Sequence, residues 1–135
     1  MIKTLLATSL LALSVPALAH EPGSDAATVR LGQTLRLNGM TVTPIKLLED
    51  SRCPMNARCI WAGTVRIAAR IEITARKASG RHVQTREMEL NKPTMLGATE
   101  LMLSDVEPPR MAGGPARKLH YRFTFTITPP LPPVT

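Results

Sequence analysis

Residues 65–74 place an apolar side chain at every second position, and this pattern constrains the fold more than any other feature of the chain. The apolar members are Val65, Ile67, Ala69, Ile71 and Ile73. A period of two is typical of a β-strand with one buried face, whereas a helix repeats its apolar positions every three or four residues. Residues 119–128 repeat the pattern, with Leu119, Tyr121, Phe123, Phe125 and Ile127 on the predicted inner face. The sequence therefore predicts β-sheets that each bury one face.

Short turn signals separate the strand patterns. Val29, Leu31, Leu35 and Leu37 alternate with polar neighbours and predict strand as far as Asn38-Gly39. That dipeptide favours a type I′ hairpin, because both of its turn positions need a positive φ. The return strand is predicted over residues 40–48, with Pro44 at an edge or a bulge because proline has no N–H to donate.

A second hairpin is predicted at Ser79-Gly80, which would return the chain along residues 82–90. Pairing around that turn sets Glu89 opposite Arg70 and places Met88 and Leu90 on the inner face.

Residues 101–106 predict a further strand, which Pro108-Pro109 would end. No segment has a helical period. The expected fold is all-β, an antiparallel β-sandwich of about seven strands that is Ig-like in architecture.

The first nineteen residues are typical of a secretory signal peptide. Lys3 gives a positive start, residues 5–15 are largely apolar, and Ala17-Leu18-Ala19 forms a small-residue cleavage site. The apolar run is shorter than the about 20 residues that span a bilayer. We therefore expect cleavage before His20 and a periplasmic or secreted product with no membrane span. The expected organisation is a signal peptide (1–19), a flexible arm (20–27), a sandwich domain (28–128) and a proline-rich tail (129–135).

The chain is basic, with 17 Lys and Arg against 10 Asp and Glu and a net charge of +7. The basic residues are scattered and the few aromatics do not alternate with them, which argues against nucleic acid as a partner. Arg66 and Arg70 are predicted on a solvated outer sheet face. A positive surface also favours anionic envelope polymers or lipid head groups, so an anionic partner stays open.

The two cysteines, Cys53 and Cys59, lie in one short segment. Cysteines in an exported chain usually pair, so a disulfide between them is predicted. Pro54 would stiffen the ring and Gly63 would permit a bend before the long strand. Trp61 is expected either to pack against the disulfide or to cap the open end of the sandwich.

The surrounding motif is Asp50-Ser51-Arg52-Cys53-Pro54 followed by Cys59-Ile60-Trp61-Ala62-Gly63. With the flanking hairpin and long strand, it resembles a family of small exported bacterial β-proteins that has no characterised activity. The resemblance covers residues 31–90, with a weaker match over residues 101–109. It implies a fold and an export route, and it carries no catalytic residue.

A ring closed by a disulfide and stiffened by proline is typical of loops that recognise partners, because rigidity lowers the ordering cost of binding. The residues predicted to be exposed and to contact a partner are Arg52, Met55, Asn56 and Arg58, with Trp61 beside them. An envelope protein or an anionic envelope polymer is the expected partner. The alternative is that these residues only cover the disulfide.

Copper binding is the second candidate function. Cleavage after Ala19 would expose the amine and imidazole of His20 to one metal ion, and methionine thioethers suit Cu(I). Against it, His82 and His120 have no ligand spacing, and the methionines Met40, Met88 and Met102 fit core positions equally well. We therefore expect no cofactor, with copper as the alternative.

Hydrolysis is the third candidate, since Ser51 and Asp50 would form a triad with a distant histidine. No glycine-flanked nucleophile elbow is present, and Asp50 and Ser51 are better explained as turn residues that bond nearby backbone N–H groups. Arg52 is expected to pair with Asp50 or Glu49. The sequence thus favours a non-enzymatic structural or binding module of the cell envelope, with a periplasmic copper-binding protein as the alternative.

Overall fold

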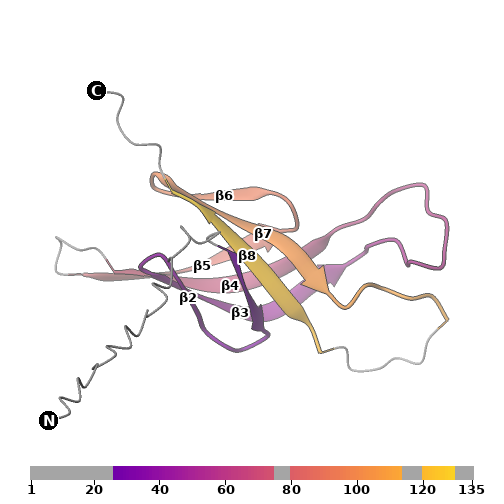
Figure 1. Cartoon of the computed structure of the whole chain (residues 1–135), viewed down its shortest axis with the longest axis horizontal. Coiled ribbons are helices and arrows are strands. Elements are labelled where there is room, and N and C mark those ends of the chain that lie inside the picture. Colours follow the sequence, from indigo (N-terminus) through magenta and orange to yellow (C-terminus); the bar gives the residue numbers. More distant parts are fainter. Residues whose placement is uncertain (1–25, 75–79, 114–119, 130–135) are drawn as a thin grey trace, which may run out of the picture.

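The computed structural model describes residues 26–74, 80–113 and 120–129, which form eight strands and no helix. The strands make two four-stranded antiparallel sheets that pack against each other as a β-sandwich (Figure 1). This confirms the all-β sandwich predicted from the sequence, with one strand more than expected. The strands are β1 (Ala26–Arg30), β2 (Leu35–Leu37), β3 (Met40–Asp50), β4 (Val65–Thr74), β5 (Arg81–Glu89), β6 (Pro93–Leu96), β7 (Thr99–Glu107) and β8 (Arg122–Thr128).

Each sheet is largely a meander. One has the order β2-β3-β4-β5, and the other has the order β1-β8-β7-β6, so the first strand pairs with the last. At the β5–β6 corner the Leu90 N–H donates to the Val65 carbonyl (2.9 Å) in one sheet, and the Asn91 N–H donates to the Leu103 carbonyl (2.8 Å) in the other. Two successive residues thus bond the two sheets together.

The core between the sheets is aliphatic, with two phenylalanines, and none of the described residues that form it is polar. The alternation at residues 65–73 and 123–127 falls as predicted, because every second side chain points inward. Several members of the core have no exposed area: Val65, Ile67, Ala69, Ile71, Leu101, Leu103, Phe123 and Phe125.

The segment from Val29 to Leu37 is not one strand, contrary to the interpretation of the sequence. β1 lies in one sheet and β2 in the other. Gly32 turns the chain between them with a φ of 79°, and its N–H donates to the Pro44 carbonyl (2.7 Å). Alternation looks the same on both sides of such a crossing, because both strands face one shared core.

The β2–β3 hairpin confirms the prediction at Asn38-Gly39. Both residues have positive φ, 41° and 80°, and Leu37 pairs with Met40 directly across the turn. Pro44 lies at a register shift of the β3–β4 ladder, as expected for a residue without an N–H.

The β4–β5 register differs from the prediction. Arg70 pairs with Thr85 and not with Glu89, which pairs with Arg66. The displacement is an even number of residues, so Met88 still faces the core, at 1% exposure, and the two faces keep their character. The predicted turn at Ser79-Gly80 lies partly outside the described residues.

Arg66 and Arg70 lie on the outer sheet face, as predicted, within a set of exposed ion pairs. These join Arg66 to Glu49 and Glu87, and Arg70 and Arg81 to Glu72. The strand predicted at residues 101–106 is β7. β6 was not expected, because it is only four residues long and begins with Pro93.

β1 begins at Ala26, two residues inside the expected flexible arm. The signal peptide (1–19), the rest of the arm and residues 130–135 of the tail lie outside the described residues. Within the described ranges the chain contains no helix long and apolar enough to cross a membrane.

Candidate functional site

Residues 51–64, called here the stapled loop, connect β3 to β4 and project from one end of the sandwich (Figure 1). The two arms of the loop continue the antiparallel pairing of these strands. The Ser51 N–H donates to the Thr64 carbonyl (2.8 Å), and the Cys53 N–H donates to the Ala62 carbonyl (3.0 Å). The Thr64 N–H donates to the Ser51 hydroxyl (3.1 Å), so Ser51 closes the base of the loop as a turn residue.

The tip of the loop is closed by a disulfide between Cys53 and Cys59, whose Cα atoms are 5.8 Å apart. Inside the ring the Ala57 N–H donates to the Pro54 carbonyl (3.1 Å) and forms a turn. The predicted pairing of the cysteines is confirmed. Covalent closure and this turn leave the ring little conformational freedom.

Gly63 allows the two arms to approach. Its φ is 69°, and a Cβ atom at this position would overlap the Ser51 carbonyl and crowd the Arg52 Cα. The bend expected at this glycine is therefore required by both backbone conformation and space.

A polar cluster of Asp50, Arg52 and Tyr121 lies beneath the loop. Arg52 donates to both carboxylate oxygens of Asp50, from Nε (2.9 Å) and from Nη2 (2.8 Å), and the Tyr121 hydroxyl donates to Oδ2 (2.9 Å). The Arg52 and Asp50 side chains are only 15% and 6% exposed. The expected partner of Arg52 is thus confirmed as Asp50.

The electrostatics of the cluster follow from this geometry. Burial by itself would raise the pKa of the Asp50 carboxyl, but the hydrogen bonds from Arg52 and Tyr121 and the charge of Arg52 hold that pKa below its ordinary value. The bond to Asp50 raises the pKa of Arg52. Burial and the same carboxylate raise the pKa of Tyr121. The cluster is an ionised pair over the ordinary pH range.

Arg52 also joins the stapled loop to the end of β7 and to the β7–β8 loop, whose described parts are residues 108–113 and 120–121. Its Nη1 donates to the Val106 carbonyl (2.6 Å) and its Nη2 to the Pro108 carbonyl (2.9 Å). In return, Arg110 Nη1 donates to the Arg52 carbonyl (3.0 Å). The guanidinium of Arg52 was expected to be an exposed contact, and this expectation is wrong because four acceptors hold it inward.

Asn56 makes a second connection between the two loops. Its Nδ2 donates to the Ala112 carbonyl (3.0 Å), and its Oδ1 accepts from the Ala112 N–H (2.7 Å). The Met55 N–H donates to the Arg110 carbonyl (2.9 Å). The Asn56 amide therefore imitates a backbone partner and fixes one loop against the other.

Large apolar side chains are exposed on these two bonded loops. Ile60 is 91% exposed, Trp61 79%, Met55 73% and Met111 60%. An exposure of 79% shows that Trp61 does not cap the open end of the sandwich, whereas its packing against the disulfide stays a prediction. Ile60 and Met111 were not among the predicted contact residues, although Ile60 is part of the motif.

The remaining predicted site residues do not converge. His20 lies outside the described residues, and His82 and His120 are both exposed. Across the described ranges, no group of three or more His, Cys, Asp or Glu side chains has metal-binding geometry. Ser51 donates to Glu49 Oε1 (2.9 Å), and Asp50 is bound to Arg52 and Tyr121, so the residues weighed for a triad have other partners.

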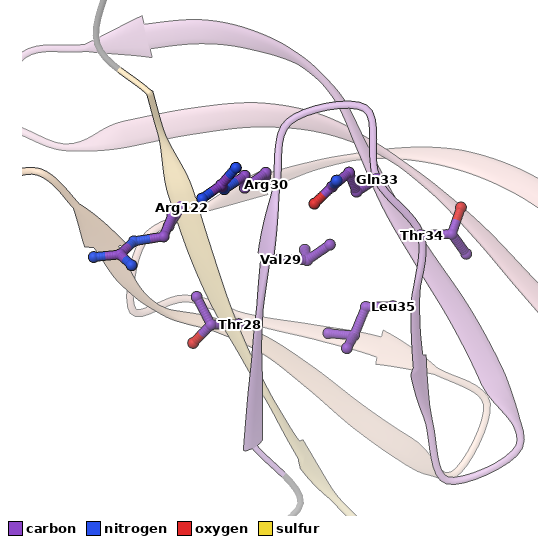
Figure 2. Close-up of a pocket in the computed structure, with 7 residues that line it drawn as sticks. All are labelled: Thr28, Val29, Arg30, Gln33, Thr34, Leu35 and Arg122. Carbon is purple, nitrogen blue, oxygen red and sulfur yellow. The ribbon is translucent and has the colours of Figure 1, made fainter.

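An open hollow of about 700 Å³ lies between β1 and β2. Figure 2 shows Val29, Gln33 and Leu35 facing the space between these strands, whereas Arg122 lies on the far side of β1. Arg122 pairs with Glu107 (2.7 Å), so it contributes no free charge to the hollow. The stapled loop is the stronger candidate site.

Comparison with protein-family models, with curated proteins and with solved structures finds no match to this chain.

Proposed function

We propose that this protein is an exported, non-enzymatic binding module of the cell envelope, and that the stapled loop is its recognition surface. The observation that carries the proposal is the exposure of two adjacent bulky side chains, Ile60 at 91% and Trp61 at 79%. Burial of apolar area is worth about 25 cal/mol per Å². A partner that covers these two side chains would therefore gain a large part of its affinity from them.

Rigidity of the loop supports the same function. The disulfide closes the ring at the tip of the loop. Arg52 bonds the loop to the carbonyls of Val106 and Pro108, and Asn56 bonds it to Ala112. Binding to a loop that is already ordered does not incur the entropy cost of ordering it. Tryptophan is also the residue type most enriched among the dominant contacts of protein interfaces.

In the proposed function, the predicted loop residues have two roles. Met55, Arg58 and Trp61 are exposed and suit contact with a partner, and Ile60 and Met111 join them. Arg52 and Asn56 are positioning residues, because their polar atoms are used within the protein.

Export of the chain is part of the proposal. The disulfide supports it, because such bonds persist in oxidising compartments, and the signal-like start of the sequence points the same way. The expected location is the periplasm or the exterior of the cell.

Co-sedimentation with isolated bacterial cell envelopes tests the proposal. Trp61→Ala is expected to weaken envelope binding at least about tenfold, since hot-spot truncations commonly have that effect. Val83→Ala is the matched control, because Val83 is a 49% exposed apolar residue on β5, away from the loop. Equal binding by both variants and the unaltered protein would contradict a recognition role for the loop.

A further inference from the structure

The exposed side chains of the two loops have the composition of a membrane-contacting tip. Met55 lies within the ring closed by Cys53 and Cys59, Ile60 and Trp61 directly follow that ring, and Met111 lies on the loop that is bonded to it. Tryptophan favours the interface between lipid and water, because its ring is apolar and its indole N–H is polar. Aliphatic neighbours of this kind favour the acyl boundary over a sugar surface, which is usually bound through several aromatic rings.

The charged side chains of these two loops are all positive. Residues 51–64 and 108–113 contain Arg52, Arg58 and Arg110 and no Asp or Glu. Arg52 is neutralised by Asp50, whereas Arg58 and Arg110 form no ion pair with any residue that the structure describes. By contrast, three arginines of the outer sheet face, Arg66, Arg70 and Arg81, are paired with Glu49, Glu72 and Glu87. Uncompensated positive charge therefore accompanies the exposed apolar side chains.

The backbone of the loop limits how deeply such a tip can enter a bilayer. Pairing of the arms reaches Cys53 and Ala62, and the ring contains one internal backbone bond, from Ala57 to Pro54. Unpaired N–H and C=O groups are excluded from the hydrocarbon core. Insertion is therefore confined to side chains at the head-group boundary, as in other interfacial contacts.

We propose that the tip of the stapled loop docks on an anionic lipid bilayer, with Ile60 and Trp61 entering the interface and the exposed Arg58 meeting the head groups. This inference rests on the proposed function, since it names the partner of the same loop. The positive charge of the tip favours an anionic lipid surface as the partner. Each basic residue near an anionic membrane raises the partitioning of a protein onto that membrane about fivefold.

The protein contains one tryptophan, so its intrinsic fluorescence reports on this contact directly. Mixing with vesicles of equal parts phosphatidylglycerol and phosphatidylcholine is expected to shift the Trp61 emission to the blue, and vesicles of phosphatidylcholine alone are expected to leave it unchanged. Raised salt weakens the shift, because it screens the attraction between exposed charges.

Matched variants separate the apolar and the electrostatic parts. Ile60→Ser is expected to weaken vesicle binding about tenfold, and Arg58→Gln about fivefold. The controls are Val83→Ser for the apolar change and Arg86→Gln for the charge, because both residues are exposed on β5 outside the loop. Both controls are expected to bind as the unaltered protein does. Sedimentation of the vesicles measures each of these affinities.

The results also separate this inference from the proposed function. If neither vesicle binds while envelope binding still depends on Trp61, the lipid is the wrong partner and a protein or polymer takes its place. Equal binding to both kinds of vesicle, or equal loss in Arg86→Gln and Arg58→Gln, would overturn specificity for anionic lipid at this tip. If envelope binding does not depend on Trp61 at all, both proposals fail.

Discussion

The two connections that flank β3, one at its start and one at its end, are of opposite kind. At its start, Asn38 and Gly39 turn the chain back to β2, flanked by Leu37 and Met40, which are both buried. At its end, residues 51–64 leave the sheet, are closed by a disulfide and are bonded to a loop more than fifty residues away in the sequence. The first connection exposes no large apolar side chain, and the second exposes three.

The difference shows how the two turns are stabilised. The hairpin needs only two residues that adopt positive φ, so its conformation is local. The stapled loop depends on Arg52, Gly63 and the disulfide together. Gly63 and the disulfide act within the loop, whereas Arg52 acts through contacts with a remote segment. Changes that remove one support at a time should therefore affect the two connections very differently.

The largest effect is expected from Arg52→Ala. The substitution leaves the Asp50 carboxylate, 6% exposed, with Tyr121 as its remaining side-chain partner and leaves two carbonyls of the β7–β8 segment without their donor. Opening a buried ion pair of this kind costs about 3–4 kcal/mol. Urea unfolding measures the loss. Arg66→Ala, which removes two ion pairs on the exposed sheet face, should cost much less. Equal losses in the two variants would show that the cluster adds nothing beyond a surface pair.

Alanine at the glycine of each connection compares them most directly. At Gly39 (φ 80°) no atom lies within 4 Å of an added Cβ, so only the left-handed backbone conformation opposes the change, at about 1 kcal/mol. At Gly63 the Cβ also overlaps the Ser51 carbonyl, and a loss of about 3 kcal/mol is expected. Thermal unfolding of Gly39→Ala and Gly63→Ala gives the two values. A smaller loss at Gly63 than at Gly39 would contradict the close approach of the arms.

Replacing both cysteines with serine tests the covalent support alone. Loop-closure entropy for so short a ring predicts a loss of about 2.4 kcal/mol. The pairings of Ser51 with Thr64 and of Arg52 with Asp50 lie below the ring, so the sandwich should keep its fold, as circular dichroism would show. An unchanged unfolding midpoint would mean that these hydrogen bonds already fix the ring.

The smallest effect is on the pH dependence of stability. Because the folded protein lowers the pKa of Asp50 below its ordinary 3.8, the ionised carboxylate stabilises the fold above that pH, and this stabilisation is lost as the pH falls through the folded pKa. Unfolding measured in acid should therefore show a decline that Asp50→Asn reduces. Gly39→Ala, at the other connection, should keep the acid decline of the unaltered protein. A decline unchanged in Asp50→Asn would assign it to other carboxyl groups.

Much of the fold was predicted from the sequence because it depends on local rules. Alternation predicted the inner faces of β4 and β8, and turn chemistry predicted the Asn38-Gly39 hairpin. The disulfide was predicted because a chain expected to be exported contains two cysteines. The register of β5 was wrong because a charge match between Arg70 and Glu89 contributes only a few tenths of a kcal/mol. The energy of such a pair is too small to fix the register of β5 against the larger contributions of the turn and the core.

The candidate site was predicted in place but not in detail. The motif located the loop and included Trp61, yet it gave Arg52 as an exposed contact and did not indicate that the exposed Asn56 bonds to Ala112. Their true partners, the backbone of residues 106–112, are remote in sequence and carry no side-chain pattern that would announce them. For the same reason Met111 could not be assigned to the exposed set before the two loops were seen to be bonded.

The sequence by itself determined that this chain forms sheets with one buried face, where a two-residue hairpin lies and which cysteines pair. These properties depend on side-chain period, backbone φ and short separation along the chain. Only the tertiary structure decided that Val29 and Leu37 lie in different sheets, that Arg52 is turned inward and that Ile60 and Trp61 are turned outward. Those outcomes depend on which distant carbonyls and carboxylates are available to satisfy a buried charge, and nearest neighbours in the chain do not specify them.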